Sequence, residues 1–447
     1  MLKNRHLSFL FVFLIMFSFF QISNLDSNYS YGDDFAQYIM QSKALFDSSS
    51  NEYELQTKLN SYSPTQIGPN AYPIGYPIAL KIIEVFSNGD FKYYKIVNII
   101  FFSLYVLFSF LIISKKSKNF ALLVSGLLLC SQEILNLSQS IESDLMFGLF
   151  CIISVYYLEN KNNPFVAILI AFLSILIKVQ GLIFLVLLTI CIYQKNILNK
   201  FRIPFAIFLF SYLLVYLSPY RYFLGEYKDH FRQFSPYFLN FRYNLNILSE
   251  SMLPEFIQNS LFNYFIFLIL IYALTKTLLN LKSISIHNLL ILGYFSFFSL
   301  YLNQQGIRFL LVFLPSIFIL FFELLDFKSL KVNFGIYLIA LLVIINLQFP
   351  LTVNLPNHAF SEESTSLYSY INNNIDKKKY ISAEKPRLIR LTTGTNAVYL
   401  EEASILKSPD YLLISDVNLI KYNAKLESYT LIKKIGQFNL YELIRNK

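Results

Sequence analysis

Long apolar runs recur along most of this 447-residue chain, and they restrict its fold more than any other feature of the sequence. A transmembrane helix needs about 20 mostly apolar residues to cross about 30 Å of hydrocarbon. About eleven runs are candidates for such a helix: residues 7–22, 93–114, 120–137, 144–158, 164–178, 181–193, 203–219, 260–279, 286–302, 309–325 and 332–349. The sequence therefore predicts an α-helical polytopic membrane protein with about eleven transmembrane helices.

The composition supports this fold class and excludes two others. Hydrophobic residues make up 55% of the chain and charged residues 15%, against about 45–50% and about 25% in soluble domains. The chain is neither repetitive nor poor in apolar side chains, which excludes a disordered or fibrous protein. In a membrane protein, a net charge of +9 indicates an unequal distribution of charge across the bilayer. The sequence thus predicts the lipid bilayer as a partner and no nucleic acid.

Basic residues give the expected orientation in the membrane. With the N-terminus inside and the spans alternating, the inner loops are basic and poor in acids. These inner residues are Lys115, Lys116, Lys118, Lys161, Lys195, Lys200, Arg202, Lys276, Lys282, Lys328 and Lys331. Residues 76–86 are too short to span, so we expect a helix on the outer surface there. No small-residue cleavage site follows Ile22, so residues 7–22 are expected to stay as the first span. The expected N-terminus is therefore cytoplasmic.

This alternation of spans divides the chain into two expected domains. Residues 1–351 form the transmembrane domain, with a large outer loop at residues 23–90 and a second outer loop at residues 220–259. Residues 352–447 have the composition of a soluble domain, and we expect a small extracytoplasmic α/β domain there. Its expected strands are residues 380–382, 388–391, 411–414 and 438–443, and its expected helix is residues 364–375.

An acidic pair, Asp33-Asp34, follows the outer end of the first expected span. Two adjacent carboxylates at a membrane face can serve as a general base, as metal ligands, or as both. The alternative is that Asp33 caps a helix that starts here, or that both side chains are simply solvated.

Four other segments add polar side chains to the expected outer face. Tyr72 and Tyr76 lie in a Pro/Gly/Tyr cluster, and Glu142 and Asp144 lie between the third and fourth spans. Lys178 lies in a nearly continuous apolar run, where a charge costs about 2.5–3.5 kcal/mol at a helix centre. The alternative for Lys178 is that its side chain extends to the interface from a short span.

These residues predict one outward-facing site if the spans pack as a bundle. Lys178 and Arg308, which precedes the tenth span, supply positive charge at comparable depth. Such cations stabilise a phosphate that leaves, while a carboxylate removes a proton from an attacking hydroxyl or amine. Tyr72, Tyr76, Glu142 and Asp144 are expected to line the same cleft. The membrane setting favours a donor whose phosphate lies at the headgroup level.

In this order the segments resemble the GT-C superfamily of membrane glycosyltransferases. The likeness is to the branch with protein O-mannosyltransferases and the bacterial lipid A aminoarabinose transferase. Those enzymes carry an Asp-Glu or Asp-Asp pair in the first outer loop, followed by Tyr and Ala. The matching segments are Asp33-Asp34 with Ala36 and Tyr38, Tyr72-Pro73 through Tyr76-Pro77, Asp144, Lys178 through Gly181, Arg308-Phe309-Leu310 before Pro315, Glu384 through Leu388, and Tyr441. The match covers nearly the whole chain.

The resemblance implies transfer of a sugar from a polyprenyl-phosphate-linked donor on the outer face of the membrane. It also implies a bacterial plasma (inner) membrane as the location. It implies that Asp33 is the general base and that Asp34 supports it or contributes to a metal site. Lys178 and Arg308 would hold the donor phosphate. The usual second residue of the pair is often Glu, so the role of the shorter Asp34 stays open. Metal dependence varies within the superfamily, so a divalent metal stays open as well. The sugar is open too, as is the acceptor, which is a lipid, a protein or a glycan.

Two other classes of function compete with this interpretation. A multi-pass transporter or flippase of a lipid-linked or charged solute would also use an intramembrane lysine and acids near helix ends. Against it, the spans show no internal repeat and no pair of broken helices in corresponding halves. The third class is a structural assembly factor with an inactive acidic loop, and the intact Asp33-Asp34 pair argues against it.

Overall fold

The computed structural model describes residues 5–29, 34–45, 72–87, 90–194, 237–252, 260–279, 284–299, 306–325, 358–400 and 409–444. The chain forms two compact units. The helical unit comprises Met1–Leu25 and Lys95–Val353, and the mixed unit comprises Asp26–Tyr94 and Asn354–Lys447. Asp33 and the expected spans at residues 203–219 and 332–349 lie outside the described residues.

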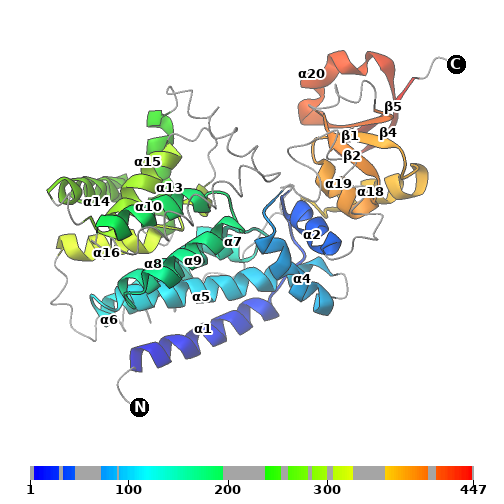
Figure 1. The fold of residues 1–447 in the computed structure, drawn as a ribbon. Helices are drawn as coiled ribbons and strands as arrows, with labels where there is room; N and C mark the ends of the chain where they lie inside the picture. The colour runs from blue at the N-terminus through cyan, green and yellow to red at the C-terminus, as the bar shows by residue number, and fades with distance from the viewer. Residues whose placement is uncertain are drawn as a thin grey trace. The chain divides into compact units, whose positions relative to one another are not determined.

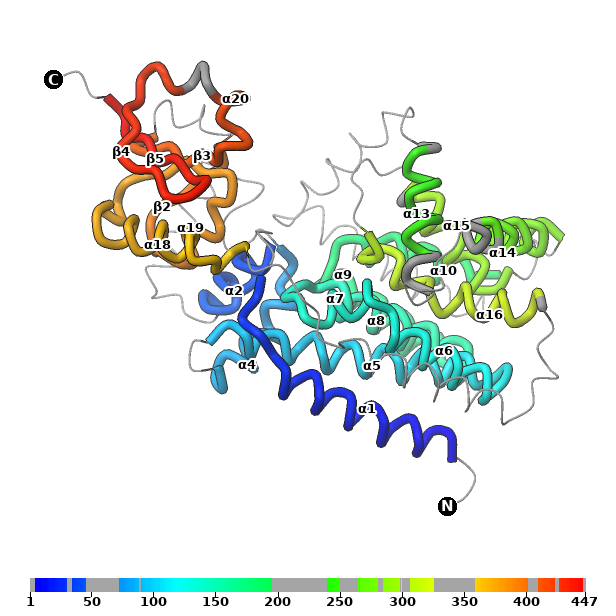
Figure 2. Tube along the Cα trace, turned by 180° about the vertical axis from the view of Figure 1, so that it is seen from behind, coloured from blue at the N-terminus to red at the C-terminus, as the bar shows by residue number. Residues whose placement is uncertain are grey.

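Two helices in the described ranges are long and apolar enough to cross a membrane. They are α1 (Arg5–Ser23) and the continuous stretch Phe91–Ile113, which joins the short helix η2 (Phe91–Tyr94) to α5 (Lys95–Ile113). In Figures 1 and 2, α1 runs alongside α5. The rings of Phe17 and Phe102 pack edge to face with centroids 5.7 Å apart. The first two expected spans are therefore present as helices, and their ends lie within two residues of the expected positions.

The third expected span is not one straight helix. The structure has α6 (Lys118–Cys130) and α7 (Gln132–Ser138), bent by 66° at the break between them. Ser131, the residue at the break, has extended backbone angles (φ −72°, ψ 111°), which interrupt the helical ladder. The expected span over residues 120–137 therefore corresponds to a bent pair of helices, which together are long enough for one span.

The next three helices are α8 (Asp144–Glu159), α9 (Pro164–Ile175) and α10 (Gly181–Gln194). Asn163 accepts a hydrogen bond from Val166 N and Pro164 takes the first helical position, so the sequence itself starts α9. The helix ends at Ile175, three residues before the end of the expected span. A Cβ on Gly181 would lie 2.7 Å from the Ile175 nitrogen. The chain therefore turns between α9 and α10 at a close approach that only glycine permits.

The last described helices of this unit are α13 (Tyr237–Met252), α14 (Ser260–Leu279), α15 (Ile286–Ser299), η5 (Gly306–Phe309) and α16 (Leu314–Leu325). The expected tenth span began at residue 309, but α16 begins five residues later. Pro315 explains this difference, because proline is tolerated in the first turn of a helix and not in its interior. Helix α13 lies within the second expected outer loop. Several of these helices are shorter than a full span, and the count of about eleven stays a prediction.

The mixed unit begins with α2 (Asp34–Ala44) and α4 (Gly75–Ser87), which pack against each other. The helix expected at residues 76–86 is thus present, while its position at a membrane surface stays a prediction. Its buried residues include Tyr76 and Leu80. Ile82 and Val85, on another part of the helix, are 62% and 74% exposed.

The rest of the mixed unit contains a five-stranded sheet with the order β2-β1-β3-β5-β4. The strands are β1 (Tyr380–Ala383), β2 (Asn396–Tyr399), β3 (Tyr411–Ser415), β4 (Tyr429–Ile435) and β5 (Phe438–Leu443). β1 is parallel to β2 and β3, while β5 is antiparallel to β3 and β4. The expected strands at residues 380–382, 411–414 and 438–443 are confirmed, and α18 (Glu362–Asn374) confirms the expected helix.

The expected strand at residues 388–391 is wrong, because these residues lie in α19 (Pro386–Thr393). Pro386 takes the first helical position, and Gly394 ends the helix with a φ of 68°. Ile389 of α19 lies beside Leu413 of β3. Tyr422, in the short helix α20 (Leu419–Tyr422), packs on the neighbouring β3 residues. Successive residues of a strand face opposite sides, so helices cover both faces of the sheet. The short helices η8 (Asp416–Asn418) and η9 (Asn423–Ser428) flank α20.

Candidate functional site

Four charged residues meet inside the helical unit, and we call them the charge cluster. Lys178 Nζ lies 2.5 Å from Asp144 Oδ1, and Arg308 Nε lies 3.1 Å from Asp144 Oδ2. The same Arg308 nitrogen lies 3.1 Å from Glu142 Oε2. The sequence placed these four residues in one site, and the structure brings them together within ion-pair distance.

Each member of the charge cluster sits where a helix is interrupted. Asp144 is the first residue of α8, where a carboxylate is favoured by the helix dipole. The preceding loop is fixed by Asn98 of α5, whose side-chain amide donates to the carbonyl oxygens of Ser140 and Glu142, each at 2.8 Å. Lys178 lies in the turn between α9 and α10, and Arg308 lies in η5. Three breaks in the helical bundle are thereby joined by charge.

The charge cluster is balanced, with two acids and two bases. The side chains of Asp144 and Lys178 are 1% and 10% exposed, so this pair is shielded from solvent. Those of Arg308 and Glu142 are 21% and 22% exposed. Lys178 also lies over the Phe309 ring, with Nζ 5.0 Å from its centroid. An anionic ligand from solvent can therefore reach Arg308 more readily than Lys178.

A second polar group lies in the mixed unit and contains Asp34, Tyr72 and Arg387. The Tyr72 hydroxyl donates to Asp34 Oδ1 at 2.6 Å. Arg387 Nη1 donates to the same carboxylate oxygen at 3.0 Å and to the Tyr72 hydroxyl oxygen at 2.8 Å. Asp34 is the first residue of α2, and Asp33 lies just outside the described residues. The three side chains thus form a closed triangle, which we call the Asp34 triad.

Aromatic packing holds the Asp34 triad in place. Tyr38, one turn along α2, stacks on Tyr72 with ring centroids 4.6 Å apart, and meets Tyr76 edge to face at 4.9 Å. The Gln41 side chain donates to the Tyr72 carbonyl oxygen at 2.9 Å. The sequence placed Tyr72 and Tyr76 beside the acidic pair, and the structure places both tyrosines beside α2. Tyr38 and Gln41 lie on the same face of α2, and both contact Tyr72.

Burial raises the pKa of the Tyr72 hydroxyl well above its usual range, and the neighbouring Asp34 carboxylate adds to this effect. The Arg387 guanidinium opposes it, because a positive charge favours the tyrosinate. Tyr72 therefore remains protonated at neutral pH and acts as a hydrogen-bond donor to Asp34.

Sequence reasoning did not assign a role to Arg387. It noted the segment Glu384 through Leu388 only as a match to an outer soluble domain. One signal for such a role was available in the sequence. Arg387 is a basic residue that directly follows Pro386, at the start of a helix that comes after a strand. Its partner Asp34 is 353 residues away in the chain, so no local pattern reveals the contact.

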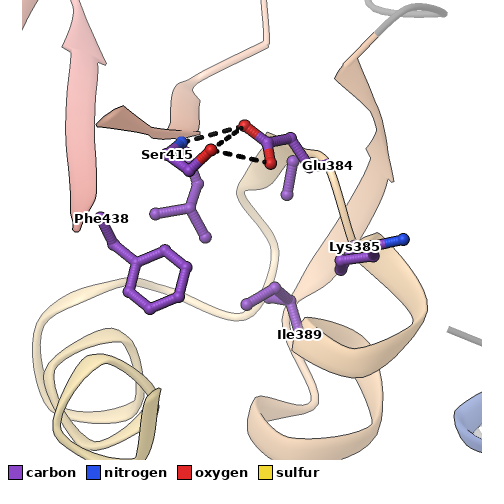
Figure 3. A pocket seen from close by; sticks show the side chains of 7 residues that line it. Glu384, Lys385, Ile389, Ser415 and Phe438 are labelled. Carbon is purple, nitrogen blue, oxygen red and sulfur yellow. Dashed lines mark hydrogen bonds between the residues drawn. The ribbon is translucent and has the colours of Figure 1, made fainter. Parts of the chain in front are cut away.

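The turn that carries Arg387 is anchored by Glu384. The Glu384 carboxylate accepts hydrogen bonds from the backbone nitrogen and the hydroxyl of Ser415, both at 2.9 Å (Figure 3). These contacts join the carboxyl end of β1 to that of β3. The cavity there is only about 10 Å³, and Ala383, Lys385, Ile389, Leu413 and Phe438 complete its lining. Such a volume holds about one water molecule, so this corner supports the turn and does not accommodate a sugar.

A metal site was left open by the sequence. Within the described ranges, no three His, Cys, Asp or Glu residues lie close enough together to hold a metal ion. Asp34 forms an ion pair with Arg387, and Asp144 forms one with Arg308.

Comparison with known proteins gives a likeness in structure. No protein-family model matches the sequence, and no curated protein matches it either. The crystal structure of ArnT from Cupriavidus metallidurans bound to undecaprenyl phosphate is similar over 99% of each chain, with a TM-score of 0.58 and 11% identity. ArnT from the same organism in the apo state is similar over 96% of this chain and 97% of that one, with a TM-score of 0.60 and 12% identity.

At this level of identity the likeness is one of fold. It extends over nearly the full length of both chains, so it includes the helical part and the tail together. The expected polytopic membrane fold is supported at this coarse level. The resemblance seen in the sequence is confirmed at the level of the fold, which is similar to that of ArnT.

Proposed function

We propose that this protein is a GT-C-type glycosyltransferase that takes a sugar from a polyprenyl-phosphate-linked donor. The observation that carries the proposal is the full-length fold likeness to a protein crystallised with undecaprenyl phosphate. An acidic pair at the start of a loop helix and a lysine-arginine cluster at helix breaks are the residue types that such a transfer requires.

The proposed reaction is a single displacement at the anomeric carbon of the sugar. An acceptor hydroxyl or amine attacks this carbon, and the bond from the carbon to the phosphate oxygen breaks. The acceptor proton passes to the Asp33 carboxylate, and polyprenyl phosphate leaves with the bonding electron pair. Asp34 supports Asp33, which immediately precedes it in the chain.

Lys178 and Arg308 are proposed to bind the donor phosphate. Arg308 is the more accessible of the two, and its pairing with the partly exposed Glu142 is weak enough to exchange. A phosphate that replaces Glu142 at Arg308 gains charge-assisted hydrogen bonds to a guanidinium. Lys178 remains paired with Asp144 and adds positive charge behind that site.

The proposed orientation follows the lysine distribution. The N-terminus is cytoplasmic, the tail is extracytoplasmic, and transfer takes place on the outer face of a plasma (inner) membrane. The acceptor is a lipid, a protein or a glycan.

The test measures polyprenyl phosphate, because this product forms whichever acceptor is used. Purified protein is incubated with polyprenyl-phosphate-linked sugars and a membrane extract as the acceptor source, and the released polyprenyl phosphate is quantified by mass spectrometry. Release by the wild type and a loss of about 100-fold or more in Asp33→Asn are expected. The control is Asp376→Asn, an exposed acid in a turn of the tail, which should retain full activity.

Two outcomes would contradict the proposal. Equal release by wild type and Asp33→Asn would remove the assigned base. Binding of the lipid without release of polyprenyl phosphate under any acceptor would favour the transporter or flippase.

A further inference from the structure

Arg387 is a charged residue that is almost completely buried in the tail of this chain. Only 4% of its surface is exposed, and it lies in the first turn of α19, directly after Pro386. Arginine is almost never fully buried unless it is paired. The requirement for a partner is met by Asp34, at the start of α2 in the same unit. Figure 2 shows α19 next to α2, and the two helices are in direct contact.

The geometry around Arg387 is suited to fixing a carboxylate in one position. Its guanidinium donates to Asp34 and to Tyr72, and Tyr72 donates to the same oxygen of Asp34. The guanidinium carbon also lies 5.1 Å from the centre of the Tyr72 ring and 5.9 Å from that of Tyr399, in β2. A planar guanidinium presents its donors in a rigid fork while its face lies against the rings, whereas a lysine ammonium is a point charge on a flexible stem.

The support for Arg387 comes from the sheet. Pro386 fixes the first helical φ, and Glu384 binds Ser415 at the end of β3. The turn between β1 and α19 is therefore held at two positions directly before Arg387. This arrangement is more rigid than a side chain reaching from a free loop, and it transmits the position of the sheet to the start of α2.

We propose that Arg387 is a positioning residue for the acidic pair, supplied by the tail. It holds Asp34 as the orienting partner, and Asp33 directly precedes Asp34 in the chain. This inference rests on the proposed function and assigns a different role to each residue of the pair. Asp34, which already accepts hydrogen bonds from an arginine and a tyrosine, orients, and Asp33 receives the proton. The soluble tail is then part of the catalytic machinery.

Variants of Arg387 are suited to a test because the protein should still fold. The Asp34 side chain is 37% exposed, so loss of the guanidinium leaves this carboxylate in contact with water and not as an unpaired buried charge. Arg387→Met keeps the length of the side chain and removes its donors, and Arg387→Lys keeps the charge. The matched control is Lys379→Met, which removes a cation that pairs with Asp410 within the same unit, at 3.1 Å.

The experiment measures the rate of polyprenyl phosphate release as a function of donor concentration in the full-length protein. Arg387→Met should lower kcat by about 100-fold, the effect of a misplaced catalytic group, with the donor KM unchanged within about 2-fold. Arg387→Lys should recover part of kcat, and Lys379→Met should retain all of it. Asp34→Asn combined with Arg387→Met should lose no more than the stronger single variant, because the two residues act as one unit.

Thermal unfolding of each variant separates positioning from simple structural support. If Arg387→Met and Lys379→Met lose activity equally, or if the loss follows the melting temperature alone, the positioning role is refuted. A fully active Arg387→Met refutes it as well, while leaving Asp33 and the proposed function untouched. A wild type that releases no polyprenyl phosphate refutes the proposed function, and this inference with it.

Discussion

Replacing Asp144 by asparagine tests whether the charge cluster is held together by a buried ion pair. At 2.5 Å and an effective dielectric constant of about 20, the gross attraction between Lys178 and Asp144 is about 7 kcal/mol. Removing both ions from water costs several kcal/mol each, so the net contribution of the intact pair is close to zero. Asp144→Asn removes the attraction but leaves the Lys178 ammonium buried. It should therefore lower the free energy of unfolding by about 3–5 kcal/mol.

The matching double variant makes this prediction specific. Adding Lys178→Met to Asp144→Asn removes the uncompensated charge and should recover most of the lost free energy of unfolding. Glu142→Gln, which changes a carboxylate that is 22% exposed, should cost less than about 1 kcal/mol.

The assay is unfolding of the full-length protein in mixed micelles. The mole fraction of sodium dodecyl sulfate is raised, and loss of helix is followed by circular dichroism. A free energy of unfolding for Asp144→Asn within about 1 kcal/mol of wild type, or no recovery in the double variant, would show that the pair does not control stability.

Three further predictions follow from single sites. Gly181→Ala should destabilise the protein by roughly 1–3 kcal/mol in the same assay, because the new Cβ would lie 2.7 Å from Ile175 N; unchanged stability would contradict the close approach. The raised pKa of Tyr72 means that the folded state holds this proton more tightly than the unfolded state. The stabilisation is thus complete below about pH 10 and lost as the pH rises further. Melting temperatures between about pH 8 and pH 11 should accordingly fall more for wild type than for Tyr72→Phe, and parallel curves would refute this. Ile420→Cys, at a position that is 90% exposed, should react in intact cells with a membrane-impermeant maleimide if the tail is extracytoplasmic. The native Cys130, Cys151 and Cys191 are buried and supply the unreactive background, and labelling only after lysis would reverse the orientation.

Local sequence patterns predict an element of this fold correctly where the local signals agree. The run at residues 438–443 alternates β-favouring side chains next to a turn, and it forms β5 at the predicted bounds. The run at residues 388–391 is equally short and apolar, but Pro386 and Gly394 supply helix start and stop signals that prevail over it. The apolar run at residues 120–137 predicts length correctly and misses the bend, since nothing in hydropathy marks Ser131.

Some residues of the candidate site can be predicted from the sequence and others cannot. An intramembrane lysine is costly enough to predict a nearby acid, and Lys178 does pair with Asp144. The sequence identified both members but could not assign the pairing, which depends on how three helix breaks meet. Arg387 is the opposite case. Its burial and its partner arise from packing between α19 and α2, so only the folded chain reveals that the tail reaches the acidic pair.

We expect this protein to bind a polyprenyl phosphate through its charge cluster. The most direct measurement is the melting temperature of the purified protein with undecaprenyl phosphate, with undecaprenol as the phosphate-free control. A ligand at about 100 times its Kd stabilises the folded state by about 2.7 kcal/mol. We expect a rise with undecaprenyl phosphate only, lost in Arg308→Ala and kept in Lys116→Ala, whose lysine pairs with Glu323. Equal shifts with both lipids, or a shift that survives in Arg308→Ala, would contradict the claim.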